Sequence, residues 1–165
     1  MTTLPATLSA IAILLAGAIF GFFYAWVCST MWGLDQADPR VAIDAMKAMN
    51  ASVRNVVFMP AFFFTPVALA AASWAWFASG QPMSTILFGA AAAVYLGLGL
   101  ILTTVINVPM NEALAATPTP TDIEAARVVW ANYSQPWQFW NTVRTIASGG
   151  ALMLATLGLM AVSRA

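Results

Sequence analysis

The chain has 165 residues and a formal net charge of zero; 61% of its residues are hydrophobic and 7% are charged. A soluble globular domain carries about 25% charged residues, so this composition, with a mean hydropathy of +0.82, excludes an ordinary soluble protein. The balanced charge gives no electrostatic basis for binding nucleic acid. The absence of histidine excludes His-ligated haem, His-bearing zinc or copper sites, and Ser–His or Cys–His catalytic groups.

Long stretches without Lys, Arg, Asp or Glu divide the chain. One precedes Asp35, one separates Arg54 from Glu112, and one separates Arg144 from Arg164. A helix needs about 20 apolar residues to cross a bilayer, and the middle stretch is long enough for two crossings. The sequence therefore predicts one all-α domain, an integral membrane four-helix bundle embedded in the lipid bilayer, with spans over residues 4–32, 53–77, 83–110 and 136–162.

The first span is expected to be a permanent helix, because its apolar run exceeds the 7–15 residues of a signal peptide. Gly17 and Gly21 form a G-x-x-x-G face suited to close helix contact. Cys28 is the only cysteine, so no intrachain disulfide forms. Its apolar neighbours in sequence favour a buried thiol.

The second span should follow directly from a helix that begins at Asp38-Pro39, where Asp38 is the N-cap and Pro39 the first helical residue. We expect this helix to continue without interruption into residues 53–77. Pro60 and Pro66 should kink the span, which a bilayer tolerates when neighbouring helices bond to the freed carbonyls.

The second half of the chain has clearer boundaries. Residues 79–82 (SGQP) predict a tight turn, and residues 117–120 (TPTP) predict a linker. A capping box over 121–124 predicts a short helix to about Tyr133, before the last span begins near Pro136. Small residues repeat every fourth position in the third span, at Gly89, Ala93 and Gly97. This stripe and the earlier glycine pair fit internal packing and a homo-oligomer equally well.

The polar residues are distributed unevenly across the membrane. With four spans, both termini and the 79–82 turn share one side, and residues 35–55 and 111–136 share the other. Counting Arg144 in the fourth span near this side, the second side holds five of the six Lys and Arg residues and all six acidic residues. We expect short interfacial helical extensions there and call it the elaborated end. The positive-inside rule predicts that it is cytoplasmic, in the cell membrane if the chain is bacterial, unless these charges serve a site instead.

Polar side chains recur at helical spacing where the spans reach the elaborated end. Polar groups near a bilayer tend to face the bundle interior or a watered cavity, so these stripes predict a shared pocket. Their members are Tyr24, Ser29 and Thr30 in the first span, Asn50 and Arg54 at the start of the second, Thr103, Asn107, Asn111 and Glu112 along the third, and Trp137, Asn141, Arg144 and Ser148 in the fourth.

Structural alternatives remain open for each member. Arg144 borders an apolar run and fits a side chain that reaches out to lipid head groups. Asn107 and Asn111 fit interhelical hydrogen bonds, and Glu112 fits a structural salt bridge with an arginine. An ordinary aromatic belt accounts equally for Trp130, Trp137 and Trp140. Lipid contact or core packing is expected for Phe58, Phe62, Phe63 and Phe64.

Two motifs resemble the anthrone oxygenase-like family, a group of small four-span membrane proteins. Residues 107–114 (NVPMNEAL) close the third span, and residues 137–144 (WQFWNTVR) open the fourth. Residues 48–50 (AMN), ahead of the second span, fit as well. Many members of this family have no assigned activity.

The resemblance implies that a polycyclic anthrone is oxygenated to an anthraquinone by O2 without a metal or organic cofactor. Such a site must stabilise the substrate anion with cationic or hydrogen-bond donors. We expect Arg144 and Asn111 to act as catalytic donors, and Glu112 to act as the base. A small lipophilic aromatic ligand would be bound by Asn50, Arg54, Thr103, Asn107, Tyr133, Trp137, Trp140 and Asn141, with the aromatic rings stacking on it.

Two other functions fit the same pocket. The first is a non-catalytic membrane module that binds a small lipophile or a partner protein. The second is a transporter, which fits less well because small exporters commonly use an intramembrane acidic residue, and the deep portions of these spans have none. Oxygen uptake with an anthrone separates the oxygenase from the binding module.

Overall fold

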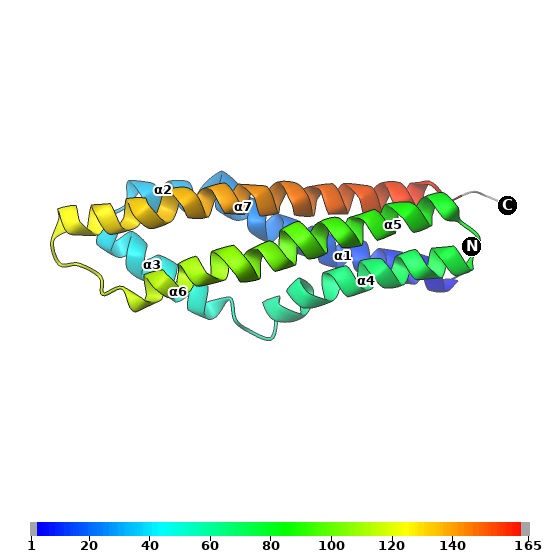
Figure 1. The fold of residues 1–165 in the computed structure, drawn as a ribbon, viewed down its shortest axis with the longest axis horizontal. Helices are drawn as coiled ribbons and strands as arrows, with labels where there is room; N and C mark the ends of the chain where they lie inside the picture. The colour runs from blue at the N-terminus through cyan, green and yellow to red at the C-terminus, as the bar shows by residue number, and fades with distance from the viewer. Residues whose placement is uncertain (1–2, 163–165) are drawn as a thin grey trace.

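The computed structural model describes residues 3–162, and every regular element within them is helical. The chain has four long helical rods, and successive rods run in opposite directions (Figure 1). Each rod packs against its sequence neighbours, and the first also packs against the fourth. The chain therefore forms the all-α four-helix bundle that the sequence predicts.

Two of the rods are built from more than one helical segment. The first rod is α1 (Thr3–Ala25), continued by a π-helical turn (Trp26–Thr30) and α2 (Met31–Gln36), and the second rod is α4 (Phe58–Ala78). The third rod is α5 (Pro82–Val94), continued by two π-helical turns (Tyr95–Ile101 and Thr103–Asn107) and α6 (Val108–Ala116). The fourth rod is α7 (Ile123–Met160). The helix α3 (Pro39–Ser52) connects the first rod to the second.

The rods differ in length, and this difference shapes the elaborated end. All four are long and apolar enough to cross a membrane, with 34, 21, 35 and 38 residues. At 1.5 Å per residue α4 is about 31 Å long, which matches a hydrocarbon core of about 30 Å. The other three rods exceed that thickness by roughly 20 Å. The chain is thus an integral membrane protein in which three rods project beyond the N-terminal start of α4 at Phe58.

The start of α1, the 79–82 turn and the end of α7 lie at the opposite end of the bundle (Figure 1). Gly80 adopts a φ of 69° in this turn, a left-handed conformation that glycine takes without steric cost. The lopsided bundle predicted from the charges is therefore present. Its cytoplasmic orientation stays a prediction, and Arg164, the remaining cation in that count, lies outside the described residues.

Close packing between rods involves one predicted glycine, Gly89 of α5, where an added Cβ would lie 3.3 Å from the Ser73 hydroxyl oxygen of α4, and also glycines that the sequence patterns do not indicate. A Cβ added to Gly158 of α7 would lie 2.9 Å from the ring of Phe88, which is fully buried. In contrast, nothing lies within 4 Å of a Cβ built on Gly17, Gly21 or Gly97. The expected close contact at the G-x-x-x-G face is therefore not made within this chain, and a role in a homo-oligomer stays a prediction.

Pro66 in α4 frees a carbonyl that another rod satisfies. Proline has no N–H, so the carbonyl of Phe62, four residues earlier, loses its helical donor. The buried hydroxyl of Tyr95 donates to that carbonyl at 3.0 Å. The predicted compensation by a neighbouring helix is thus present at Pro66. Pro60 lies in the first turn of α4, where an N–H has no helical partner to lose.

Two predicted helix boundaries are wrong. The helix beginning at Pro39 does not continue into the second span, because Asn55 interrupts it. The Asn55 carboxamide oxygen accepts from the backbone N–H groups of Val57 and Phe58 at 2.8 and 3.0 Å, as an N-terminal cap does. Conversely, α7 continues through Pro136, since one missing hydrogen bond is outweighed by packing on both sides of the proline.

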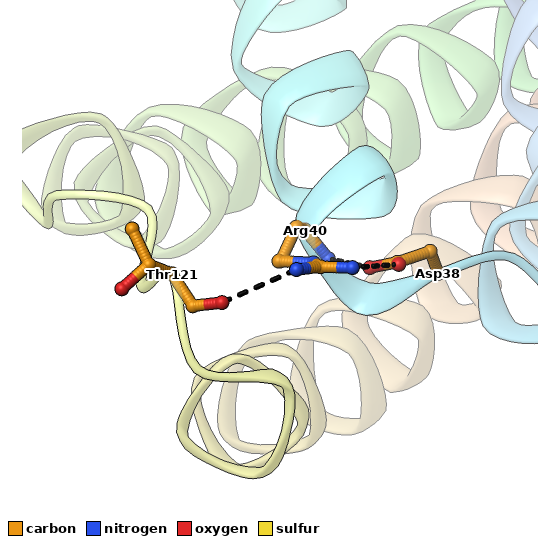
Figure 2. Close-up of polar contacts among 3 residues, drawn as sticks. All are labelled: Asp38, Arg40 and Thr121. Atoms are coloured by element: carbon orange, nitrogen blue, oxygen red, sulfur yellow. Dashed lines mark hydrogen bonds and ion pairs between the residues drawn. The ribbon is translucent and has the colours of Figure 1, made fainter.

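Charged residues fasten α3 to the loop before α7 (Figure 2). Asp38 caps α3 by accepting from the backbone N–H of Arg40 at 2.9 Å, and it pairs with the Arg40 guanidinium at 2.6 Å. These hydrogen bonds lower the pKa of Asp38 to about 2. Arg40 also donates to the Thr121 carbonyl at 3.2 Å, and Lys47 donates to the Thr117 carbonyl at 2.6 Å. Arg40 and Lys47 therefore hold α3 against this loop, in addition to any effect on the orientation of the chain in the membrane.

The start of α7 also differs slightly from the prediction. Asp122, rather than Thr121, is the N-cap, and its carboxylate accepts from the backbone N–H of Ala125 at 2.8 Å. The capping residue therefore lies one position later than the capping-box spacing indicates.

Replacing Tyr95 with Phe should leave the Phe62 carbonyl unpaired and lower the free energy of unfolding by about 1–3 kcal/mol. Adding Pro66→Ala supplies a backbone N–H for that carbonyl, so Tyr95→Phe should have a smaller effect in that background. Unfolding in detergent micelles measures this double-mutant cycle. Tyr24→Phe, at an exposed tyrosine, is the matched control. Equal losses in both backgrounds would contradict the proposed compensation.

Candidate functional site

A cavity of about 350 Å³ lies where the short rod α4 begins. The three longer rods continue past this point, and α3 covers the space that α4 leaves empty. Most of the lining is apolar and comes from α1, the first π-helical turn, α3 and the connection after it, α4, α6 and α7: Phe22, Phe23, Trp26, Met49, Val53, Phe58, Met59, Phe62, Phe63, Val108 and Trp137. The cavity is thus an aromatic-walled pocket at one end of the bundle.

Sequence reasoning missed much of this wall. Phe58 and Phe62 pack in the core and Phe63 is partly exposed, as expected, but all three also line the cavity, which the sequence does not predict. Phe22 and Trp26 had not been singled out. The repeats of Phe22 with Trp26 and of Phe58 with Phe62 at four-residue spacing were the available signal, because that spacing places side chains on one helix face.

The polar lining consists mostly of predicted site residues. The structure brings together Asn50, Arg54, Thr103, Asn111, Glu112 and Arg144, and adds Thr104. They come from α3, the connection to α4, the third rod and α7. The stripes on separate helices therefore converge on one cavity.

Arg144 lines the cavity with a side chain that is almost completely buried. Its residue is 5% exposed, so the alternative of an arginine reaching out to head groups is wrong. The guanidinium carbon lies 4.5 Å from the centre of the Phe23 ring and 5.3 Å from that of Trp137. Within residues 3–162 no carboxylate pairs with it, and its Nε has no hydrogen-bond partner. A cation that is buried without a counter-ion is a ready site for an anionic ligand.

Neutral oxygens hold the Arg144 guanidinium in place. Asn141 accepts from Nη2 at 2.7 Å, and its own amide nitrogen donates to the Phe23 carbonyl at 3.2 Å. Thr103 accepts from Nη1 at 3.3 Å while its hydroxyl donates to the Gly99 carbonyl. Asn141 does not itself line the cavity. Its contribution is to orient the arginine.

The π-helical turns lie beside this polar group. Trp26 and Thr103 each begin such a turn and each line the cavity. A π-helical turn contains an extra residue, so side chains that follow it are rotated relative to a regular helix, and such turns are frequent at functional sites. Asn107 ends one of them and does not line the cavity. It is fully buried, and neither of its side-chain polar atoms has a partner.

Asn111 lines the cavity, and its side-chain oxygen is occupied by two hydrogen bonds, which leaves the amide nitrogen as the group that can donate to a ligand. The oxygen accepts from the Tyr133 hydroxyl at 2.8 Å and from the Trp137 indole N–H at 2.9 Å. The indole nitrogen is only a donor, which fixes the orientation of the Asn111 amide. Asn50 donates to the Tyr133 hydroxyl at 3.3 Å. Tyr133 itself does not line the cavity, so it positions Asn111 instead of stacking on a ligand there.

Glu112 and Arg54 lie at the exposed edge of the cavity. Their charged groups are 3.4 Å apart, and their side chains are 61% and 55% exposed. An ion pair this exposed and this long contributes little to stability. Both side chains are therefore free to rearrange when a ligand binds.

Several predicted residues lie elsewhere. The Trp140 ring packs on Phe139 and does not line the cavity. Tyr24 and Ser29 are exposed on the outside of the bundle, as is Cys28, for which a buried thiol was expected. Further out, a carboxylate missed in sequence joins the first rod to the fourth. Asp35 accepts hydrogen bonds from Trp130, Ser134 and Gln138.

The sequence profile of the anthrone oxygenase family matches residues 49–154, which is more than half of the chain. The chain belongs to the anthrone oxygenase family. Comparison with curated proteins and with solved structures returned no match. The anthrone oxygenase profile includes every polar residue that lines the cavity, from Asn50 to Arg144. The cavity residues of the first rod lie outside it.

Arg144→Met should leave the free energy of unfolding of this anthrone oxygenase family member within about 1 kcal/mol of the wild-type value, or raise it, because a buried unpaired charge contributes little to folding. The free energy of unfolding in detergent micelles measures this. A loss above about 3 kcal/mol, the size expected for breaking a buried pair, would make Arg144 a structural residue.

Proposed function

We propose that this chain oxidises a lipophilic anthrone-like ketone to the corresponding quinone with O2, inside the cavity at the start of α4. Membership of the anthrone oxygenase family supports the reaction class. The observation that carries the proposal is the buried Arg144 guanidinium, which lines an aromatic-walled cavity without a carboxylate partner. A cation in that position favours a substrate that becomes an anion.

The cavity suits a flat aromatic molecule. Its volume lies within the range of about 300–1,000 Å³ usual for small-molecule pockets. Phe58, Phe62 and Trp137 supply ring faces and edges on opposite rods, which stabilise a planar ligand by offset stacking and edge contacts. A substrate with one carbonyl and several fused rings places its oxygen towards Arg144 and its rings among the phenylalanines.

The polar groups stabilise the anion that forms from such a ketone. Loss of a methylene proton places negative charge on the carbonyl oxygen. The Arg144 guanidinium and the free amide nitrogen of Asn111 are donors towards that oxygen, while Asn141 and Tyr133 hold these donors in position. Donors that are fixed in advance within an apolar cavity stabilise developing charge more strongly than water does.

Glu112 accepts the methylene proton in this proposal, because among residues 3–162 it is the only carboxylate that lines the cavity. The resulting carbanion gives one electron to O2, and the radical pair combines to form a carbon–oxygen bond. Loss of water from the hydroperoxide leaves a second carbonyl. One O2 oxygen enters the quinone and the other leaves as water, so the substrate supplies all four electrons and no further reductant is needed.

Purified protein in lipid nanodiscs should consume O2 when anthrone is added, and Arg144→Gln should lower kcat/KM by about 10²–10³-fold, as loss of an anion-stabilising donor does. Arg127→Gln is the matched control, because Arg127 lies on the same helix in an exposed ion pair with Glu124. Oxygen uptake is followed with an electrode. Equal rates in both variants would remove Arg144 from the mechanism.

Glu112→Gln separates the base from the anion site. This variant should bind anthrone with near wild-type affinity and consume O2 at a greatly reduced rate, because the carboxamide cannot accept the proton. Anthrone binding without O2 uptake by the wild-type protein would instead identify a non-catalytic binding module.

A further inference from the structure

A groove on the outer surface of α4 shares part of its wall with the cavity. The groove is lined by Arg54, Asn55, Val56, Met59, Pro60, Phe63 and Phe64. Three of these residues, Arg54, Met59 and Phe63, also line the cavity. Met59 and Phe63 therefore separate the interior from the surface as a single layer of side chains.

The third rod forms the other edge of this thin wall. α4 packs along α5 and the π-helical turn Tyr95–Ile101, but no extensive contact joins it to residues 103–116 within the described chain. Thr104 and Val108 line the cavity from that side, and Thr104 is exposed. The two rods thus diverge beyond Ile101, and the side chains along the divergence are uncharged apart from Arg54 and Glu112 at its outer end.

The divergence faces lipid, because α4 spans only the hydrocarbon core. Phe63 lies five residues after the start of α4, which places it about 8 Å inside that core. Its side chain is 42% exposed. Towards the aqueous side, Met49, Asn50 and Val53 line the cavity, and Arg54 and Glu112 lie at its exposed edge. The thin wall is therefore open to acyl chains rather than to water.

We propose that the ligand enters the cavity sideways from the bilayer, between α4 and the third rod, by displacing Met59 and Phe63. The occupant is an uncharged lipophilic aromatic compound dissolved in the membrane, which becomes an anion only beside Arg144. The identity of this compound rests on the proposed function, whereas the entry route rests on the thin wall alone. Methionine at the wall suits this task because its unbranched side chain adapts readily.

The first test places a nitroxide label at Phe63→Cys in a Cys28→Ser background, in lipid nanodiscs. Val67→Cys is the matched control, because Val67 is exposed one turn further along α4 and does not line the cavity. Both labels should be relaxed by O2 and shielded from a water-soluble nickel complex. Anthrone added under argon should restrict only the label at position 63. Nickel access at position 63, or an equal response of both labels, would overturn the lipid route.

The second test narrows the divergence. Thr104→Trp should lower the association and dissociation rate constants for anthrone together, by about tenfold or more, with Kd changed far less, as expected for a gate. Quenching of tryptophan fluorescence under argon reports binding, because Trp26 and Trp137 line the cavity. Val105→Trp, next in sequence, exposed and outside the cavity lining, should bind at wild-type rates.

Wild-type rates in Thr104→Trp would overturn the route. Met59→Trp replaces it if that variant does not fold, with the same expected slowing and the same contradicting result. In both tests anthrone is added under argon, so neither result depends on oxygenation, and a failure of the proposed oxygenation does not affect their interpretation.

Discussion

A guanidinium buried among aromatic rings, with only neutral partners, is the interaction on which the site depends. Burying a charge without a counter-ion is unfavourable, and Arg144 is held there by Asn141, Thr103 and the faces of Phe23 and Trp137. An arginine at a surface position one helical turn away would avoid the free-energy cost of burying the charge. The arrangement is best understood as a preformed site for negative charge, which a bound ligand completes.

The cavity itself follows from the mismatch in length between α4 and the other rods. α4 begins at the edge of the hydrocarbon core, whereas its neighbours continue for roughly 20 Å beyond that edge. The space left at its start is covered by α3, which Arg40 and Lys47 fasten to the loop before α7. A short rod among three long ones therefore produces both the hollow and its opening towards lipid.

Much of this could be predicted from sequence because charge is costly in hydrocarbon and helices repeat every 3.6 residues. Gaps between charges indicate four membrane helices. Helical spacing within each span indicates a polar stripe, and the meeting of these stripes predicts one pocket for Thr103, Asn111 and Arg144. Asn107 left that stripe because a π-helical turn changes the periodicity. The task of Tyr133 in orienting Asn111 depends on three elements meeting. The continuation of α7 through Pro136 depends on packing that outweighs one lost hydrogen bond. No local sequence pattern predicts this continuation or the role of Tyr133.

The protonation state of a bound anthrone tests the anion site most directly. Under argon, where no oxygenation follows, the absorption spectrum distinguishes the neutral ketone from its anion, which absorbs at longer wavelength. At neutral pH the wild-type protein should hold anthrone as the anion, and Arg144→Gln should hold it as the ketone. A neutral ketone bound in the wild-type cavity would contradict the assignment of Arg144 as the group that stabilises negative charge.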